Sequence, residues 1–223
     1  MNKLIIAAIA LSLIASPTAF AEEKPTSVDS CKTAKSIPRN PTKLPAQKIS
    51  NTKKFTEMTI NTNCGKIVVA LETQKAPITI SKLSFLASNK FFDGTLCHRL
   101  TTSGIYVLQC GDPTATGRGG PIGWKGYIDE NLPKDTEINY PAGTIAMANG
   151  GPNTNGSQFF LVYKDSHLPP NYTIWGAITS GLDILIKVAD VGAYQVNKAD
   201  KKAYYSGDGY PIQAVEIKSI IFK

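Results

Sequence analysis

Short apolar segments separated by glycine- and proline-rich turns constrain the fold of this chain more than any other feature. Each segment is five to eight residues long and rich in β-branched or aromatic residues, as in Ile67-Val68-Val69, which is typical of β-strands. The turn sequence 63–66 joins the first two segments into a predicted hairpin. The eight predicted strands are 55–62, 67–71, 96–100, 105–109, 143–148, 158–163, 172–178 and 215–222.

Two further segments carry apolar residues at helical spacing. The first, 76–90, has Pro77 in its first turn, where proline fits a helix, and the second spans 182–191. Evenly spaced antiparallel strands predict a mainly β fold, a closed eight-stranded antiparallel β-barrel capped by the two α-helices. Residues 111–126 and 149–157 are predicted loops, and no element is predicted for 192–214.

The first 21 residues have the three parts of a secretory signal peptide. Lys3 supplies a positive charge, residues 4–15 form an apolar stretch, and Ala19-Phe20-Ala21 matches a cleavage site. The apolar stretch is shorter than the about 20 residues that span a bilayer. We therefore expect an exported protein (secreted, cell-envelope or periplasmic) that begins at Glu22. Membrane anchoring by an uncleaved signal is the alternative.

Residues 22–54 differ in composition from the rest of the chain. They contain four prolines among lysines, serines and threonines, and no aromatic residue. Such a segment buries too little apolar area to fold by itself, so we predict an extended tether. The predicted organisation is a signal peptide over 1–21, a Lys/Pro-rich tether over 22–54 and one folded domain over 55–223.

The chain has four cysteines, Cys31, Cys64, Cys97 and Cys110. An even number of cysteines in an exported chain indicates disulfides, and four cysteines allow three connectivities. We favour Cys31–Cys64, which would join the tether to the domain, with Cys97 and Cys110 close to each other. A zinc site is the competing interpretation, although no Cys-x-x-Cys occurs, and four buried free thiols are another.

Charge and composition exclude several classes of protein. The 42% of hydrophobic residues allow a sizeable core, and 18% of charged residues is too few for a disordered chain. The net charge of +7 arises mainly from dispersed lysines, with only three arginines, Arg39, Arg99 and Arg118. Nucleic-acid-binding proteins usually cluster basic residues and interleave aromatic ones. We therefore expect no nucleic-acid partner.

Common catalytic motifs are missing from the sequence. His98 and His167 are its two histidines, which is too few for a multi-histidine metal site, and no Gly-x-Ser-x-Gly motif occurs. The glycines of 117–126 do not form a phosphate-binding loop. We expect neither a metal nor a cofactor.

Two stretches that mix polar and apolar residues carry the functional signal. One is Cys97-His98-Arg99-Leu100 followed by 105–113, and the other is 147–160. Here the chain resembles the cyclophilins, the cyclosporin-binding family of peptidyl-prolyl isomerases, and is most similar to exported actinobacterial members. The resemblance runs from about residue 55 to 223. It implies a cyclophilin-like fold that isomerises X-Pro bonds and assists the folding of exported proteins.

The resemblance also implies roles for individual residues. Arg99 is the implied catalytic residue. Apart from the resemblance, we expect its neighbour His98 to face the core with its ring hydrogen-bonded. Two residues more than usual separate Arg99 from Gln109, so the turn at 101–104 is longer. The implied substrate-binding residues are Tyr106, Val107, Gln109, Gly117, Ala148, Asn149, Gly150, Gln158, Phe160, His167, Leu168 and Tyr172.

Four of these positions depart from the family pattern. Tyr106, Val107 and Tyr172 stand where the family has Phe, Met and His, and they reshape the proline pocket. His167 stands where cyclosporin-sensitive animal members have Trp, so we expect reduced cyclosporin affinity. Arg99 is intact, which predicts activity. The expected state is a monomer, and the expected substrates are X-Pro segments of unfolded or flexible proteins.

Two alternatives stay open at this point. The altered pocket positions fit a proline-peptide binding module or holdase chaperone with little turnover. The position of Cys97 and Cys110 around the Arg99 hairpin fits an isomerase whose activity depends on the redox state of these two cysteines.

Overall fold

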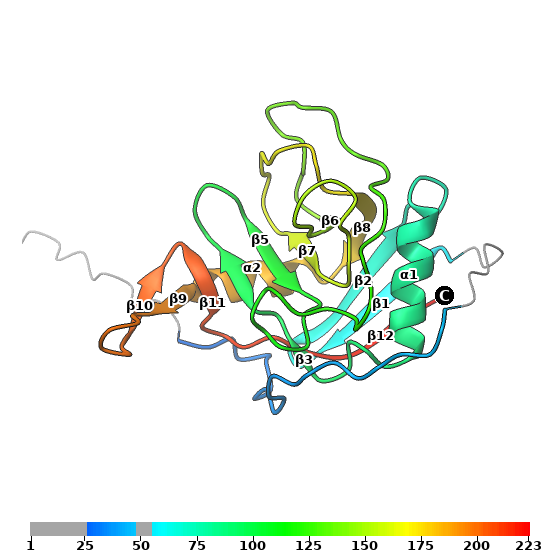
Figure 1. The fold of residues 1–223 in the computed structure, drawn as a ribbon. Helices are drawn as coiled ribbons and strands as arrows, with labels where there is room; N and C mark the ends of the chain where they lie inside the picture. Colours follow the sequence, from blue (N-terminus) through cyan, green and yellow to red (C-terminus); the bar gives the residue numbers. More distant parts are fainter. Residues whose placement is uncertain (1–25, 48–54) are drawn as a thin grey trace, which may run out of the picture.

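The computed structural model describes residues 26–47 and 55–223 (Figure 1). The predicted signal peptide, 1–21, lies outside the described residues, as do the first and last parts of the predicted tether, 22–25 and 48–54. Within the described ranges, no helix is both long enough and apolar enough to cross a membrane.

The described chain is mainly β, as predicted, and every strand pairing is antiparallel. The two helices are α1 (Pro77–Ser88) and α2 (Leu182–Val191). The strands are β1 (Glu57–Thr62), β2 (Gly65–Leu71), β3 (Thr95–Leu96), β4 (Arg99–Thr101), β5 (Val107–Cys110), β6 (Thr144–Met147), β7 (Phe159–Val162), β8 (Ile174–Ser180), β9 (Ala193–Val196), β10 (Ala203–Ser206), β11 (Asp208–Pro211) and β12 (Glu216–Phe222). They form one sheet in the order β10-β9-β11-β4-β5-β7-β6-β8-β2-β1-β12-β3.

The prediction of a closed eight-stranded barrel is wrong. The sheet has 12 strands, and in the described residues no pairing joins its terminal strands, β10 and β3. The predicted strand 96–100 divides into β3 and β4 because its hydrogen-bond partner changes at its centre. The Cys97 amide donates to the carbonyl of Val215, whereas the His98 amide donates to that of Gln109. The sheet therefore ends at β3 without closing through hydrogen bonds.

Strands β9, β10 and β11 form an extension of the sheet in the segment 192–214, for which no element was predicted. β9 pairs with β10 and β11, and β11 pairs with β4. In Figure 1 these orange strands lie on the far side of the molecule from α1. Most of their side chains are exposed, so the segment lacks the apolar alternation by which a half-buried strand is recognised. The extension places residues 208–209 beside β4.

The strands β5, β6 and β7 bury side chains on both of their faces. Successive residues of a strand point to opposite faces. One face belongs to the large core, which includes Leu108, Phe159 and Leu161 together with side chains of both helices. The other face holds a smaller apolar cluster, made of Val107, Tyr140, Ala146, Phe160, Val162 and Leu168. This double burial explains why these strands appear in the sequence as continuous apolar runs.

The predicted helices are confirmed, with slightly shorter bounds for α1. The N-terminus of α1 is capped by a carboxylate from a distant loop, since Glu130 accepts hydrogen bonds from the amides of Ile78 (3.0 Å) and Thr79 (2.8 Å). Pro77 occupies the first turn, where its missing N–H leaves no hydrogen bond unmade. The contact ties α1 to the loop 127–131.

The described part of the predicted tether is extended and lies along the domain. It has no helix or strand, and in Figure 1 the blue segment follows β3 and β12. Lys32 and Asn63 exchange hydrogen bonds of 2.9 and 2.7 Å. Ser36 donates to Glu216 at 2.6 Å, and Val28 is buried in the large core. These contacts hold the segment on the surface at several points.

Both favoured cysteine contacts are confirmed as disulfides. Cys31–Cys64 joins the extended segment to the turn between β1 and β2, and it closes a sequence separation of 33 residues. Cys97–Cys110 closes a separation of 13 residues. The second disulfide joins Cys97, two residues before β4, to Cys110, the last residue of β5, and Arg99 and Gln109 lie on these paired strands.

Removal of the Cys31–Cys64 disulfide should release the extended segment. We expect the double variant Cys31→Ser/Cys64→Ser to lose about 2–4 kcal/mol of unfolding free energy, because the unfolded chain gains conformational freedom. Limited proteolysis of the folded protein should then cut within 26–47. The variant Cys97→Ser/Cys110→Ser is the matched control and should keep this segment protected. Equal protection in both variants would show that the hydrogen bonds alone hold the segment.

Candidate functional site

The strand register places three candidate residues in one row. Arg99 of β4 pairs with Gln109 of β5, and Gln109 pairs with Phe160 of β7. Directly paired residues of antiparallel strands project from the same face of a sheet. Arg99, Gln109 and Phe160 therefore lie on one face, and Phe160 belongs to the smaller apolar cluster.

Beside this row lies an apolar floor, which consists of Val107, Phe160, Leu168 and Tyr172. The ring of Tyr172 meets the ring of Phe160 edge to face, with 5.5 Å between their centroids. Phe160 and Leu168 are 4% and 7% exposed, so the floor is a tightly packed surface rather than a deep hole. Such a floor offers van der Waals contact to a small apolar ring.

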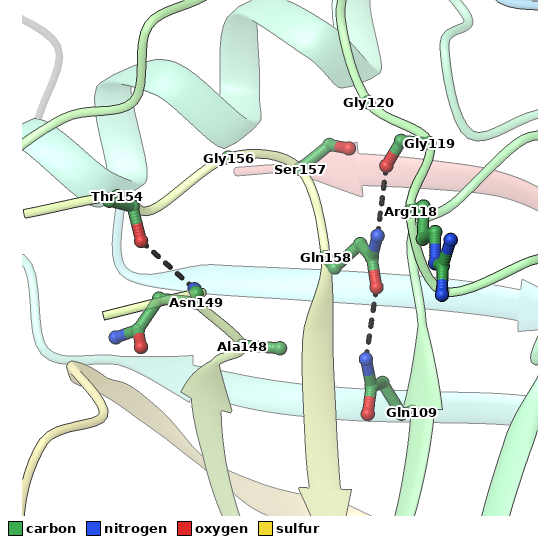
Figure 2. Close-up of a pocket in the computed structure, with 12 residues that line it drawn as sticks. Gln109, Arg118, Gly119, Gly120, Ala148, Asn149, Thr154, Gly156, Ser157 and Gln158 are labelled. Carbon is green, nitrogen blue, oxygen red and sulfur yellow. Dashed lines mark hydrogen bonds between the residues drawn. The ribbon is translucent and has the colours of Figure 1, made fainter.

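Two glutamine side chains connect Arg99 to the loop 111–126. Arg99 Nη1 lies 3.5 Å from Oε1 of Gln109, whose Nε2 donates to Oε1 of Gln158 at 2.9 Å. Nε2 of Gln158 in turn donates to the carbonyl of Gly119 at 2.9 Å, as Figure 2 shows. Each amide both accepts and donates, which fixes its orientation. We call this series of hydrogen bonds, from Arg99 through Gln109 and Gln158 to Gly119, the amide relay.

Two cavities open on this face and share Gln109 and Gly117. The amide cavity has a volume of about 250 Å³ and extends over residues 148–150 (Figure 2). The arginine cavity has a volume of about 370 Å³, and its lining includes Arg99 and Asp208. A peptide bound across the row of Arg99 and Gln109 would contact both cavities.

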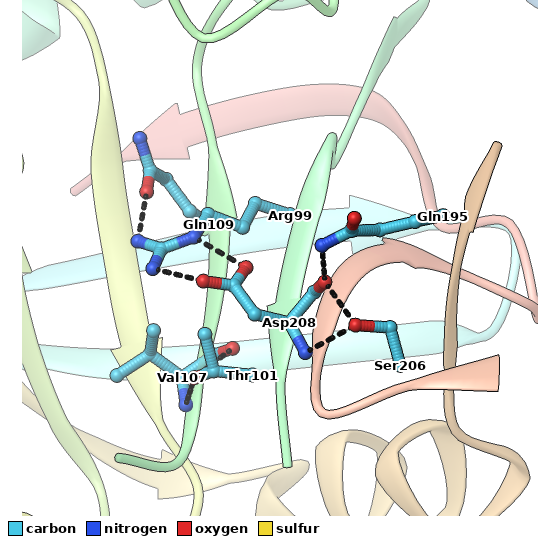
Figure 3. Close-up of polar contacts among 7 residues, drawn as sticks. All are labelled: Arg99, Thr101, Val107, Gln109, Gln195, Ser206 and Asp208. Carbon is cyan, nitrogen blue, oxygen red and sulfur yellow. Dashed lines mark hydrogen bonds and ion pairs between the residues drawn. The ribbon is translucent and has the colours of Figure 1, made fainter. Parts of the chain in front are cut away.

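Arg99 forms a two-point ion pair with Asp208 of β11. Its Nε lies 2.8 Å from Oδ1 of Asp208, and its Nη2 lies 2.7 Å from Oδ2 (Figure 3). These hydrogen bonds raise the pKa of Arg99 above its ordinary value, although partial burial opposes them. Arg99 is thus a permanent cation whose guanidinium plane is fixed from one side.

The loop 111–119 is organised around the buried carboxylate of Asp112. Asp112 accepts hydrogen bonds from the amides of Thr114 (2.7 Å), Thr116 (3.0 Å) and Gly119 (3.0 Å). Burial alone would raise the pKa of Asp112, but these hydrogen bonds outweigh it and lower the pKa. A side chain at Gly119 would collide with this carboxylate, so glycine is required where the amide relay ends.

The other two walls of the site are also anchored by polar side chains. In the loop 149–157, Asn155 donates to Asp129 at 2.8 Å. On the opposite wall, Asn139 donates to the carbonyl of Leu168 at 2.6 Å. The hydroxyl of Tyr140 accepts from the Tyr172 amide at 3.0 Å, and burial raises the pKa of Tyr140 to about 12. The apolar floor is therefore held by hydrogen bonds behind it.

Most of the predicted site residues are brought together by the fold. Ala148, Asn149 and Gly150 line the amide cavity, and Asn149 donates to the carbonyl of Asn171 at 2.8 Å. His167 lies exposed at the rim beside Leu168, with Nδ1 2.8 Å from the carbonyl of Thr136.

Tyr106 is placed differently from the other predicted site residues. It packs edge to face on Tyr163 at 5.9 Å, and the Lys164 ammonium lies 4.5 Å from its ring. Its remaining apolar contacts are with the large core, whereas its neighbour Val107 belongs to the apolar floor. A substrate role for Tyr106 stays a prediction.

His98 faces inward, as expected, but the expected hydrogen bonds of its ring are wrong. Its ring is buried, and neither nitrogen has a well-formed hydrogen bond within the described part of the chain. The nearby amide of Gln158 is engaged by Gln109 and Gly119 instead. Burial is the main reason that the pKa of His98 is lowered. The charge of Asp112 and a poorly aligned contact with Gln158 oppose this shift, and the charge of Arg99 adds to it.

Asp208 and the residues that anchor the walls of the site were not among the predicted site residues. No local pattern marks Asp208 as a partner of Arg99, because 109 positions separate the two residues. Asp112, by contrast, had a usable signal. An aspartate followed closely by two threonines and several glycines is typical of a loop in which a carboxylate accepts backbone hydrogen bonds.

Residues 56–220 match a known protein family. They match the family described as cyclophilin type peptidyl-prolyl cis-trans isomerase. A probable peptidyl-prolyl cis-trans isomerase B from Mycobacterium tuberculosis is 42% identical over 195 residues, which cover 81% of this chain and 59% of that protein. The protein of the same description from Mycobacterium leprae is 46% identical over 169 residues, covering 71% and 54%. The chain thus spans little more than half the length of these relatives.

Solved structures give the same fold. A cyclophilin type peptidyl-prolyl cis-trans isomerase from Cryptosporidium parvum superposes with a TM-score of 0.59 and 29% identity, covering 76% of this chain and 98% of that one. A second structure of that protein, obtained in the presence of the dipeptide Ala-Pro, has a TM-score of 0.57 and 29% identity, covering 75% and 98%.

The buried ring of His98 should make stability depend on pH. Because folding lowers the pKa of His98 below its ordinary value of 6.5, the unfolded chain binds a proton that the folded chain does not. The free energy of unfolding should therefore fall as the pH drops below 6.5, and chemical denaturation at several pH values measures this. His98→Gln should flatten the fall between pH 6.5 and about 5, above the range of ordinary carboxylates.

The matched control is His167→Gln, which replaces an exposed histidine and should keep the fall in stability. An unchanged fall in the His98→Gln variant would contradict the assignment of this pH dependence to the buried ring.

Proposed function

Because the chain belongs to the cyclophilin-type peptidyl-prolyl cis-trans isomerase family, we propose that it accelerates rotation about X-Pro bonds in exported proteins. The observation that carries the proposal is the position of Arg99. A permanent cation stands at the edge of an apolar floor, beside amides that can hold an extended backbone. The substrates we propose are X-Pro segments of unfolded or flexible chains.

The reaction needs a hydrogen-bond donor rather than a nucleophile. The X-Pro amide resists rotation because conjugation gives its C–N bond partial double-bond character, with a barrier of about 18–20 kcal/mol. In the twisted transition state the prolyl nitrogen regains its lone pair and accepts a hydrogen bond. A donor at this nitrogen stabilises the twisted state more than the planar one, and such differential binding accelerates the rotation.

In this proposal Arg99 is that donor. The two hydrogen bonds to Asp208 use Nε and one N–H of Nη2, so Nη1 is left to face the row of Gln109 and Phe160. One charge-assisted hydrogen bond contributes about 1.5–3 kcal/mol net in ordinary settings. A millionfold acceleration requires about 8 kcal/mol. The remainder must come from a site that is already organised before the substrate twists.

The surroundings of Arg99 suit that requirement. We propose that the proline ring lies on the apolar floor of Val107, Phe160, Leu168 and Tyr172. The amides of Gln109 and Asn149 would then hold the flanking backbone, so that the twist is confined to the X-Pro bond. The amide relay supports this arrangement because it fixes the side chain of Gln109 before any substrate binds.

His167, at the rim of the apolar floor, stands at the position that affects cyclosporin binding in the resemblance noted above. His167 stands exposed beside Leu168, with its ring engaged by the Thr136 carbonyl. A polar ring at this position offers less apolar contact than an indole, so we propose that cyclosporin binds with reduced affinity. We also propose that the protein acts as a monomer.

The sequence of the first 21 residues supports the proposal of export. A positive start, a short apolar stretch and Ala19-Phe20-Ala21 together fit a cleaved signal peptide. Two disulfides in the described residues fit an oxidising compartment. We propose that the protein assists the folding of other exported chains, in which slow X-Pro isomerisation limits folding.

Replacement of Arg99 by Ala should reduce kcat/KM for a short Ala-Pro peptide by about 10²–10³-fold, the usual effect of losing one transition-state donor. A protease-coupled or NMR exchange assay of cis-to-trans rates measures this. Arg39→Ala is the matched control. It removes another arginine, one that contacts the carbonyls of Phe91 and Asp93 outside both cavities, and it should keep full activity.

A wild-type protein that binds the peptide but leaves its isomerisation rate unchanged would contradict the proposed enzyme and favour the binding module or holdase. Full activity of the Arg99→Ala variant would mean that the protein is an isomerase in which another group donates the hydrogen bond to the prolyl nitrogen.

Expression of the full chain in a bacterial host tests the proposal of export. We expect the protein in the exported fraction, with a mature N-terminus at Glu22, because Ala21 ends the proposed cleavage site. Cell fractionation and mass spectrometry of the intact protein measure both. Ala19→Leu/Ala21→Leu should block cleavage and leave the protein at the membrane. Retention of the unmodified wild-type chain in the cytoplasm would contradict export.

A further inference from the structure

The extension formed by β9, β10 and β11 reaches the functional row through β11. Asp208 pairs with Thr101 and Gly209 pairs with Leu100, so β11 runs along the free edge of β4. Arg99 lies two residues before Thr101 and therefore projects from the same face. Diagonal neighbours on one face are within reach of long side chains, and here the arginine reaches the carboxylate of Asp208.

The geometry of this ion pair leaves the arginine a defined set of free donors. An arginine side chain has five N–H groups: one on Nε and two on each terminal nitrogen. The carboxylate of Asp208 occupies the Nε side, at 2.8 and 2.7 Å. Nη1 then points away from Asp208, toward Oε1 of Gln109 at 3.5 Å (Figure 3). That contact is long and weak, so Nη1 is available to another acceptor.

Asp208 is itself held in place by its own strands. Its carbonyl accepts hydrogen bonds from Nε2 of Gln195 at 2.6 Å and from the hydroxyl of Ser206 at 2.8 Å. Its amide donates to the same hydroxyl at 3.3 Å. Figure 3 shows these contacts on the side of Asp208 that faces away from Arg99. The carboxylate is thus presented from a fixed backbone.

The ion pair is too exposed to serve mainly as a stabilising contact. The side chains of Arg99 and Asp208 are 41% and 51% exposed, and ion pairs of this kind contribute little to folding. Both residues line the arginine cavity. A two-point pair between a guanidinium and a carboxylate does, however, fix the plane and rotation of the guanidinium. We therefore expect the ion pair to act by orienting the side chain of Arg99.

We propose that Asp208 is a positioning residue for catalysis. It holds the guanidinium of Arg99 so that Nη1 faces the prolyl nitrogen before the substrate binds, which removes the need to order a flexible side chain during the twist. The inference rests on the proposed function of Arg99. If Asp208 has this role, the extension formed by β9, β10 and β11 contributes to the active site.

The test is Asp208→Asn, which keeps the shape of the side chain but removes its charge and one of its two acceptors. We expect kcat for an Ala-Pro peptide to fall about tenfold with KM nearly unchanged, because substrate binding by the apolar floor and the amides is retained. The loss should be smaller than that of Arg99→Ala, since the donor is still present. Asp183→Asn is the matched control, because it removes another exposed aspartate, paired with Lys187 on α2, and should keep full activity.

Two further measurements separate positioning from folding. In the wild type, the Arg99 Nε–H should give an NMR signal protected from exchange with water, and Asp208→Asn should abolish that protection. In the Arg99→Ala background, Asp208→Asn should cause no further loss of the residual activity. Ser206→Ala, which loosens the backbone of Asp208, should lower kcat in the same direction but by less.

The outcomes distinguish the inference from the function on which it rests. If Arg99→Ala keeps full activity, the proposed role of Arg99 fails. If Arg99→Ala is inactive but Asp208→Asn has the wild-type kcat, or a higher one, the positioning role of Asp208 is overturned. An equal loss from Asp208→Asn with and without Arg99 would also overturn it, because Asp208 would then act through the fold.

Discussion

The pairing register of β4, β5 and β7 is the constraint on which the site depends. It places Arg99, Gln109 and Phe160 in one row on one face of the sheet, while Leu100 and Leu108 occupy the other face. A shift of one residue would turn the arginine into the large core, where an unpaired charge is very costly. The Cys97–Cys110 disulfide spans the same two strands, and the amide relay reinforces them from the side of the loop 111–126.

Around this row, the fold supplies rigidity through polar side chains that are not themselves part of the row. Asp112, Asp129 and Asn139 each anchor one loop by hydrogen bonds to backbone or side chain. A loop held in this way presents its backbone groups without the entropy loss that a mobile loop would undergo on binding. The site can therefore combine exposed loops with a fixed geometry, as a reaction that involves only rotation about a bond requires.

The sequence predicted the central elements well because each one carries a local signal. Ile67-Val68-Val69 marks a strand, Pro77 marks the start of a helix, and an even number of cysteines after a predicted signal peptide indicates disulfides. Arg99 and the residues of 147–160 were found through a family resemblance. The functional roles assigned from it stay predictions, whereas their positions near one another follow from the fold.

The features that the sequence did not reveal are long-range or exposed. The predicted strand 96–100 divides because its two halves pair with partners far apart in the chain, at Val215 and Gln109. The strands β9 to β11 have mostly exposed side chains, so no apolar alternation marks them. Asp208 depends on both features, since the extension must form before the carboxylate can reach Arg99. Local patterns contain no information on such a contact.

A crystal structure of the protein with a bound X-Pro peptide would test the proposed role of Arg99 most directly. We expect the proline ring to lie on Phe160 and Nη1 of Arg99 to lie within hydrogen-bonding reach of the prolyl nitrogen, at about 3–3.5 Å. Both hydrogen bonds from Arg99 to Asp208 should be kept. A peptide bound elsewhere, or an Arg99 that has left Asp208 and turned away from the prolyl nitrogen, would contradict this role.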